Sequence, residues 1–344
     1  MPRQRYERSK VYCHFVLSSL IVHLDVVSTF SISHGAPLRN VMGRSSYLAG
    51  SSPERIDGES SMPSQSSLRR RRFVESFFFG STLLSTSSPL ITNAATRDPK
   101  TGVLFPSVGE IESSLPTEWD ENDNPFTSSG VSSFSRLDSS PDTIFYAEPR
   151  FVEHVDAQAV EAMTSYISER LLHPGDSVLD LCSSWTSHIR PSSARKLEKV
   201  VGLGMNSKEL EANSALTEWT VLDLNADKNV KLPYENDSFD VVMCQLSIDY
   251  LIHPLEVMKE AARVLKHGGI IAILFSNRLF LTKAIGLWTG SDDIEHTYTV
   301  GSYLNYCDGG FINIKAEDLS SRRQKGKEDV IVGDPLYVVT AIKK

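Results

Sequence analysis

Residues 232–246, LPYENDSFDVVMCQL, and residues 263–275, RVLKHGGIIAILF, decide the fold of this chain. The run 239–246 is almost continuously apolar, which is typical of a strand covered on both faces. Pro254 begins an apolar-periodic helix over 255–265, His267-Gly268-Gly269 ends it, and a second apolar run follows at 270–275. This order predicts a parallel strand–helix–strand unit.

The same alternation continues on both sides of this unit. Apolar runs predict further strands at 177–181, 199–203, 219–224, 311–319 and 336–342. Helical spacing predicts helices at 155–172, 208–216 and 278–289. We therefore expect an α/β fold with a doubly wound, mostly parallel seven-stranded sheet and a terminal antiparallel hairpin.

Composition and charge narrow the function. A hydrophobic content of 40% and a charged content of 23% are those of a globular protein. Residues 1–95 carry 11 basic and 6 acidic side chains, whereas the remainder carries a net charge of −13. Such an acidic body repels phosphate backbones, so we expect no nucleic-acid partner. The cysteines and histidines have no metal-ligand spacing, so we expect no metal site.

The first 95 residues have the composition of targeting segments. Residues 1–29 combine a basic start with an apolar run, as a signal peptide does, and residues 30–68 are rich in serine and poor in acid, as a disordered transit segment is. Residues 69–95 join four arginines, an apolar run and small residues, which is typical of a twin-arginine signal. Alternatively, residues 74–91 form an uncleaved membrane anchor or a buried core helix.

This stacked order resembles the leaders of plastid proteins in algae with complex plastids. It implies a plastid location, with the thylakoid lumen favoured over the stroma, and a mature form without a stable membrane span. Residues 96–145 lack periodicity and are expected to form an extended arm, and residues 146–344 to form the globular domain.

The domain resembles the class I S-adenosylmethionine-dependent methyltransferases, of the type 11 branch. The resemblance rests on LPY…DSFDVV at 232–242 and RVLKHGG at 263–269, in type, spacing and order. A plastid and cyanobacterial methyltransferase-like subgroup is also similar, through its glycine-free SSWxSH loop and GxGMN turn. The resemblance implies S-adenosylmethionine as cofactor and a small-molecule methyl acceptor.

Two positions depart from the family pattern. The family's first loop reads D-x-G-x-G-x-G, whereas residues 180–188 read DLCSSWTSH, without glycine. The family also places an acidic residue at the end of the second strand to hold the ribose, where this chain has Gly204. Either Ser183, Ser184 and their backbone replace the glycine loop while Asn206 or Glu209 binds the ribose, or the cofactor site has been lost.

The resemblance assigns candidate site residues. Asp180 would orient the methionine amino group, and Asp223 and Leu224 would contact adenine. Gln245 closes the fourth strand at the edge of the sheet where ligands bind in such folds. The predicted cofactor-binding residues are Asp180, Leu181, Ser183, Ser184, Gly204, Met205, Asn206, Asp223, Leu224 and Gln245.

Other candidates come from chemistry and position. His253 is a weak candidate for a general base, with a role at the start of the following helix as the alternative. Tyr146, Pro149, Arg150 and His154 precede the first helix, where related enzymes fold a segment over the cofactor. The polar run 292–296, DDIEH, is expected to be a solvated loop rather than a metal site.

Three functions compete on this sequence. The first is methyl transfer from S-adenosylmethionine to a small organic acceptor by direct SN2 displacement. The second is a catalytically silent methyltransferase-like protein that binds another ligand or a protein partner. The third, a nicotinamide dehydrogenase, lacks G-x-G-x-x-G after the first strand.

Overall fold

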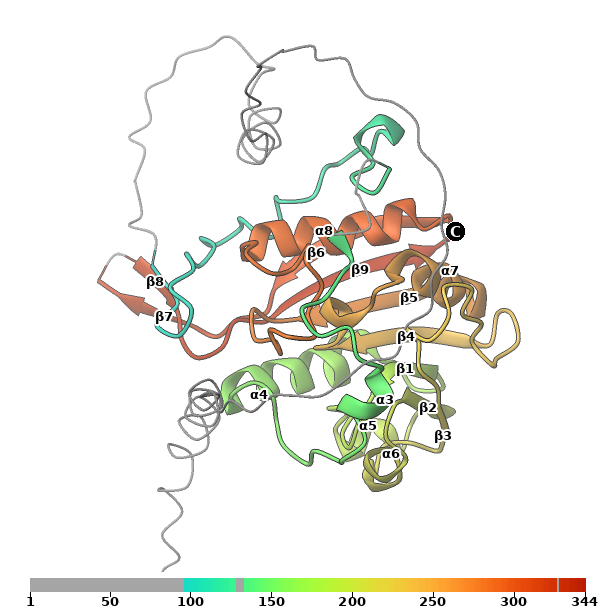
Figure 1. Ribbon diagram of the computed structural model, residues 1–344. Coiled ribbons are helices and arrows are strands. Elements are labelled where there is room, and N and C mark those ends of the chain that lie inside the picture. The colour runs from blue at the N-terminus through green and yellow to red at the C-terminus, as the bar shows by residue number, and fades with distance from the viewer. Residues whose placement is uncertain (1–95, 128–132, 327) are drawn as a thin grey trace, which may run out of the picture. The chain divides into compact units, whose positions relative to one another are not determined.

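A computed structural model describes residues 96–127, 133–326 and 328–344, so the predicted leader segments lie outside the described residues. Its main sheet has seven strands in the order β3-β2-β1-β4-β5-β9-β6 (Figure 1). These are β1 (Ser177–Ser183), β2 (Lys199–Gly204), β3 (Glu218–Val221), β4 (Phe239–Gln245), β5 (Leu265–Phe275), β6 (Phe311–Asp318) and β9 (Tyr337–Lys343). Strands β1 to β5 are parallel, and β9 is antiparallel to both β5 and β6. This confirms the predicted doubly wound sheet with its antiparallel end.

Helices cover both faces of the sheet. Helices α7 (Pro254–Val264) and α8 (Asp293–Tyr306) lie on one face, and α4 (Ala157–Tyr166), α5 (Pro191–Ala194) and α6 (Ser207–Ala212) lie on the other (Figure 1). Helix α4 continues as a π-helical turn, η3 (Ile167–Leu171), and the short elements are η1 (Glu121–Asp123), α3 (Asp142–Phe145) and η4 (Ile248–Tyr250).

Alternation along the buried strands divides the core into two. In β4, Val242 and Cys244 pack under α7 and α8, whereas Val241 and Met243 pack against α4. Both faces of β4 are therefore buried, which explains why residues 239–246 include so few polar side chains.

The predicted helix over 278–289 is wrong. The segment is a series of turns whose backbone groups pair with other parts of the chain. The amides of Gly286 and Leu287 donate to the carbonyls of Ser135 and Ser133, and that of Ile285 donates to the Asp249 carbonyl. These tertiary hydrogen bonds replace the bonds that a helix would make within itself.

The helix of this region begins instead at residue 293, inside the run predicted as a solvated loop. Asp292 accepts from the amides of Ile294 and Glu295, and the Glu295 side chain accepts from the Asp292 amide, which forms a capping box. Asp293 and His296 are buried. The loop prediction is therefore wrong, because these side chains serve a helix start and a buried contact.

Smaller differences lie at the edges of the sheet. Strand β3 ends at Val221, three residues before the predicted end, and the sequence also missed a second, two-stranded sheet of β7 (Arg322–Lys325) and β8 (Glu328–Ile331). Short, largely exposed strands give little apolar signal.

The segment predicted as an extended arm packs on the domain. Its side chains Phe105 and Ile111 are buried, and Ile111 belongs to the core cluster under α7 and α8. Arg136 pairs with Ile285 in an isolated antiparallel β-bridge, and Asp142 is buried next to Arg136. Residues 136–145 therefore pack across the turns at 278–289.

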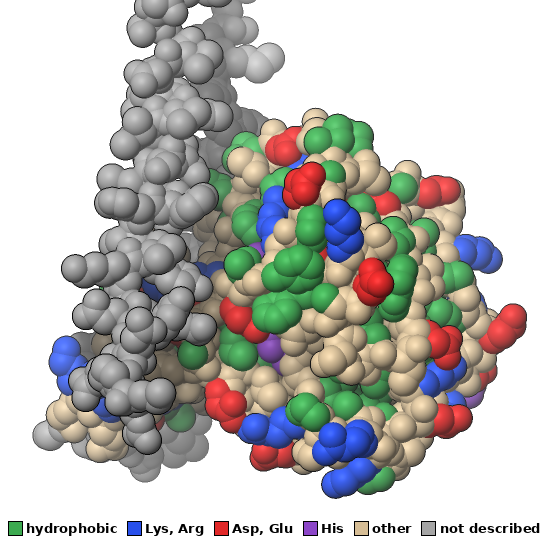
Figure 2. Space-filling model, turned by 90° about the horizontal axis from the view of Figure 1, so that it is seen from below, with side chains coloured by type: hydrophobic (Ala, Val, Ile, Leu, Met, Phe, Trp, Pro, Cys, Tyr) green, Lys and Arg blue, Asp and Glu red, His purple; other side chains and the backbone are tan. Residues whose placement is uncertain are grey.

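The surface carries charges of both signs. On the face that Figure 2 shows, acidic and basic side chains are interspersed rather than gathered by sign. Within the described residues, no helix is both long enough and apolar enough to cross a membrane.

Candidate functional site

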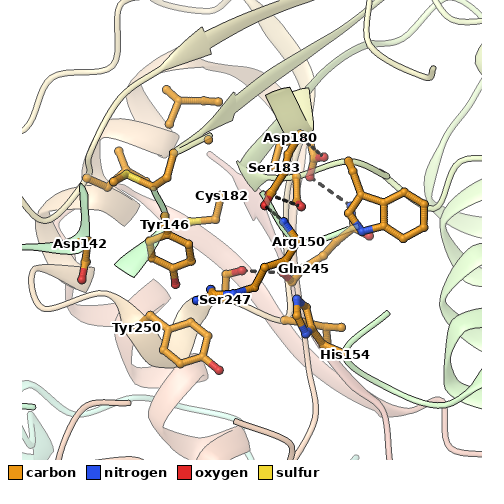
Figure 3. A pocket seen from close by; sticks show the side chains of 18 of the residues that line it. Asp142, Tyr146, Arg150, His154, Asp180, Cys182, Ser183, Gln245, Ser247 and Tyr250 are labelled. Carbon is orange, nitrogen blue, oxygen red and sulfur yellow. Dashed lines mark hydrogen bonds between the residues drawn. The ribbon is translucent and has the colours of Figure 1, made fainter. Parts of the chain in front are cut away.

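A cavity lies where the parallel strands β1 to β4 end (Figure 3). Its wall takes Asp180, Ser183 and Ser184 from β1 and the loop after it, Gly204 and Met205 from β2, Asp223 and Leu224 after β3, and Gln245 from β4. The sheet order reverses between β2-β1 and β4, and such a reversal opens a crevice at the carboxyl edge of the strands. Eight of the ten predicted cofactor-binding residues therefore line one cavity.

Asp180 is the centre of a buried hydrogen-bond network. Its carboxylate accepts from the Ser183 hydroxyl at 2.6 Å, the Ser187 hydroxyl at 2.7 Å and the Gln245 amide at 3.1 Å. Burial raises the pKa of Asp180, and these three hydrogen bonds oppose that rise. The network holds the loop after β1 against the end of β4.

The network continues to the rim of the cavity through residues not predicted as site residues. The side-chain oxygen Oε1 of Gln245 lies 2.8 Å from Nδ1 of His188, and His188 Nε2 lies 3.1 Å from a carboxylate oxygen of Glu153. Asn213 donates to the Ser187 hydroxyl at 2.8 Å. Ser187 and His188 lie in the glycine-free loop, but nothing in the sequence showed that they point towards Asp180 and Gln245.

The loop adopts glycine-like backbone angles without glycine. Cys182, at the first glycine position of the family pattern, has φ of 57°, and His188 has φ of 50°. Cys182 also sits at an irregularity in the β1–β2 register, between Leu181 and Ser183. Left-handed angles are costly for residues with a Cβ, so the loop stores strain that the surrounding hydrogen bonds offset.

Gly204 explains the missing acidic residue at the end of β2. A Cβ on Gly204 would lie 2.1 Å from the carbonyl oxygen of Ser183. The glycine-free loop therefore approaches β2 so closely that no side chain fits at this position. The two departures from the family pattern are linked by this contact.

Glu209 supplies a carboxylate to the same part of the wall. It is buried on α6, and its two oxygens accept from the Arg150 amide at 2.6 Å and the Ser184 hydroxyl at 2.7 Å. Asn206, the other predicted ribose ligand, does not line the cavity. Its oxygen caps α6, and its amide donates to the carbonyls of Tyr146 and Ala147.

Two more predicted residues lie apart from the cavity. Leu181 points into the hydrophobic core, because it alternates with Asp180 along β1. His253 is the residue before α7 and is outside the wall, as its alternative interpretation had it.

The segment before α4 covers the cavity. Tyr146, Arg150 and His154 all line it, as does Phe280 from the turn segment. The Arg150 guanidinium lies 4.3 Å from the centre of the Phe145 ring, and its side chain reaches across the cavity (Figure 3). Burial and the nearby Arg150 charge lower the pKa of His154, so its imidazole is neutral at physiological pH.

No cluster of metal-binding side chains occurs among the described residues. The cavity instead joins carboxylates, one guanidinium, two imidazoles and aromatic rings, which is chemistry suited to an organic ligand with both charged and flat apolar parts.

Residues 180–273 match the family described as methyltransferase domain, of type 11. The match begins at Asp180, ends in β5 and contains most of the cavity wall. The match and the strand order make residues 180–273 similar to a methyltransferase domain.

Among curated proteins, a 27-O-demethylrifamycin SV methyltransferase of Amycolatopsis mediterranei is 31% identical over 129 residues, which is 34% of this chain and 47% of the relative. A malonyl-acyl-carrier-protein O-methyltransferase of Marinomonas is 31% identical over 68 residues, 20% of this chain and 25% of the relative. This chain thus spans less than half the length of either relative. A solved phosphoethanolamine N-methyltransferase 2 of Haemonchus contortus, in complex with S-adenosyl-L-methionine, is 14% identical with a TM-score of 0.36, covering 54% of this chain and 52% of that one.

Proposed function

We propose that this protein transfers a methyl group from S-adenosylmethionine to a small organic acceptor by direct SN2 displacement. The observation that supports this most is the cavity at the carboxyl edge of β1 to β4, built within a matched methyltransferase domain. What S-adenosylmethionine supplies when bound is an electrophilic methyl group on a sulfonium. The residues of this chain bind the cofactor and the acceptor, orient them for in-line displacement and exclude water.

The cavity wall fits the three parts of this cofactor. Glu209 and Ser184 offer an acidic and a hydroxyl group to the ribose diol, in place of the side chain that Gly204 excludes. Asp223 and Leu224 line the cavity after β3 and would contact adenine. Asp180 and Arg150 offer opposite charges to the amino and carboxylate groups of the methionine.

The Arg150 side chain has to move for the whole cofactor to enter. The cavity volume of about 150 Å³ is below the range of roughly 300–1,000 Å³ typical of small-molecule sites. Arg150 is the long side chain that reaches across this space, so displacement of its guanidinium would widen the cavity.

His154 replaces His253 as the candidate proton acceptor. It lies on the wall of the cavity with a neutral imidazole, which can take a proton from an acceptor group as that group becomes more acidic. Its ring packs edge-on against Phe280, with 5.2 Å between ring centres.

Calorimetric titration of S-adenosylmethionine and S-adenosylhomocysteine into the purified protein tests the proposal. We expect micromolar binding that Glu209→Gln weakens about 10- to 100-fold, because a charged hydrogen-bond acceptor is worth roughly 1.5–3 kcal/mol. Glu211→Gln is the matched control, since Glu211 lies on the same helix but is exposed. Absence of binding at millimolar cofactor would overturn the proposal.

That outcome would favour the second candidate, a methyltransferase-like protein that binds another ligand or a protein partner. The features that favour it are the glycine-free loop with its left-handed Cys182 and His188, and the narrow cavity. The mixed charges in Figure 2 suit a small molecule or a protein better than a nucleic acid.

We further propose that residues 1–95 direct the protein to the plastid, and through the twin-arginine-like segment to the thylakoid lumen. The composition of these residues supports this. A fluorescent fusion to residues 1–95, followed in cells with and without the arginines at 69–72, tests it. Fluorescence that stays in the stroma of both would exclude the lumen.

A further inference from the structure

The imidazole ring of His188 lies between side chains from two distant parts of the chain. Its Nδ1 lies 2.8 Å from Oε1 of Gln245 at the end of β4, and its Nε2 lies 3.1 Å from Oε2 of Glu153 in the segment before α4. The His188 side chain is 9% exposed, and all three residues line the cavity. His188 therefore connects the segment that covers the cavity to the sheet below it.

Neighbouring acceptors fix the orientation of the Gln245 amide. Its nitrogen donates to the Asp180 carboxylate at 3.1 Å and to the Ser187 carbonyl at 3.2 Å. Both partners can only accept, so the amide nitrogen must face them and the amide oxygen must face His188. Because an amide oxygen can also only accept, Nδ1 of His188 carries a proton.

The second ring nitrogen of His188 faces an acceptor as well. The Glu153 carboxylate can only accept, so Nε2 of His188 also carries a proton. A neutral imidazole has one N–H group, and only the imidazolium has two. The two contacts of the ring together therefore require a positively charged His188.

Negative charge surrounds this ring. Glu153 faces it from the covering segment, and Asp180 lies beyond the amide that the ring contacts. Burial raises the pKa of Asp180, and the charge of His188 opposes that rise. The other basic side chains on the cavity wall are Arg150 and His154, and burial together with the Arg150 charge lowers the pKa of His154.

Loss of one ring proton would break one of the two contacts of His188. With the proton left on Nδ1, the lone pair of Nε2 would face the Glu153 carboxylate. With the proton left on Nε2, the lone pair of Nδ1 would face Oε1 of Gln245. The backbone of His188 depends on the same contacts, because its φ of 50° is costly for a residue with a Cβ and persists only where neighbours hold it.

We propose that His188 is a positioning residue of the cavity, whose imidazolium holds the covering segment, through Glu153, against Gln245 and the Asp180 network. Both of its N–H groups are engaged, so it acts through these side chains rather than on the ligand. A ligand in the cavity then binds more weakly as rising pH removes one ring proton. The protonation of His188 stands independently of the proposed function, whereas its effect on cofactor binding rests on that function.

Nitrogen-15 NMR of the histidine rings in the full chain, with ring signals assigned through backbone correlations, tests the protonation of His188. We expect the ring to keep its second proton to a higher pH in the unaltered chain than in Glu153→Gln, by roughly half a pH unit. A glutamine amide can donate to a neutral Nε2, so it removes the need for the second proton. Glu148→Gln is the matched control, because Glu148 is exposed in the same segment and lies outside the cavity wall.

Calorimetric titration of S-adenosylhomocysteine at pH 6 and pH 8 tests the effect on binding. Asparagine tolerates a left-handed backbone, and its amide nitrogen takes the place of Nδ1, so His188→Asn keeps a donor for Gln245 but not the charge. We expect the affinity of the unaltered chain to fall roughly threefold more over this range than that of His188→Asn, because only the unaltered ring loses a proton. Asp249, with a pKa of about 8, is common to both proteins and cancels in the comparison.

A merely structural role of His188 would lower the affinity of His188→Asn equally at both pH values, and that result would overturn the proposal. So would loss of the second proton at the same pH in Glu153→Gln as in the unaltered chain. Should His188→Asn not fold, Glu153→Gln replaces it in the calorimetry, where binding should weaken at a lower pH. Absence of binding at either pH would contradict the proposed methyltransferase function, while the NMR comparison would still decide the protonation of His188.

Discussion

Cys182 and Asp249 are two residues of the site region whose conformation or environment is unfavourable for their residue type. Cys182 adopts a left-handed backbone conformation that favours glycine, and Asp249 is a fully buried carboxyl group whose Oδ2 has no partner among the described residues. Residues that violate a local rule in this way concentrate at functional sites, where the surrounding structure holds them in place. Each gives a prediction that needs no knowledge of the substrate.

Cys182→Gly is expected to be more stable than Cys182→Ala by about 1 kcal/mol. Alanine keeps the clash between Cβ and the carbonyl oxygen at φ of 57°, whereas glycine has no Cβ. Urea unfolding of both variants measures the difference. A glycine variant no more stable than the alanine variant would show that the bulge after Leu181 is unstrained.

Asp249→Asn is expected to be more stable than the unaltered protein at pH 8 but not at pH 5. Burial raises the pKa of Asp249 to about 8. Between its ordinary value near 4 and 8, the unfolded chain loses this proton and the folded chain keeps it, so rising pH favours unfolding by up to about 1.4 kcal/mol per pH unit. Asparagine does not ionise, so Asp249→Asn removes this dependence of stability on pH.

The measurement is thermal unfolding of both proteins across pH 5 to 8. The difference between their melting temperatures should grow as the pH rises. A constant difference would mean that Asp249 is ionised throughout this range.

Helix α8 begins through local chemistry that a polar sequence conceals. The polar run 292–296 is a capping box followed by buried Asp293 and His296. Only one of its five residues, Ile294, is apolar, and the fully buried apolar side chains such as Val300 and Leu304 lie in the later turns of α8, so the helix start gives little apolar signal.

Asp292→Ala is expected to destabilise the protein by about 1 kcal/mol, since it leaves the first amides of α8 without an acceptor. Asp292→Ser is the control, because a serine hydroxyl caps the same amides and should cost only a few tenths of a kcal/mol. Denaturant unfolding of both variants measures this. Equal losses would assign the effect to charge rather than to capping.

For the molecule as a whole, Arg278 joins three segments that are far apart in the sequence. It bonds Asp98 from the N-terminal segment and Asp334 from the loop before β9, each at 2.7 Å. The Asp334 carboxylate also accepts from the Asp156 amide at the start of α4. Although burial opposes it, hydrogen bonds from Arg278 and Lys100 hold the pKa values of these carboxyls, Asp98 and Asp334, below their ordinary range.

Arg278→Gln is expected to destabilise the protein by about 3–5 kcal/mol, because it leaves the buried carboxylate of Asp98 without a cation and that of Asp334 with only the exposed Lys100. Lys100→Gln is the matched control. Lys100 also pairs with Asp334, but its side chain is 58% exposed, so its loss should cost at most about 1 kcal/mol. Calorimetric unfolding of both variants is the measurement. Similar losses would show that the Arg278 pairs are as solvent-screened as a surface pair.

The amino-acid sequence by itself determined the alternation of strands and helices along the chain from β1 to β5 and the mostly parallel sheet that they form. Buried strands such as β4 and β5 need apolar residues on both faces, so the pattern is visible without the structure. It also indicated the carboxyl edge of β1, β2 and β4 as the site, because parallel strands present their ends together.

Tertiary structure alone decided how the site is completed. The exclusion of any side chain at Gly204 by Ser183 and the position of the Glu209 carboxylate on the cavity wall both depend on contacts between segments distant in sequence. So do the turns at 278–289, whose backbone pairs with 133–135. The period of the apolar residues shows which face of a helix or strand is buried. Hydrogen bonds and close contacts between elements produce no such period in the sequence.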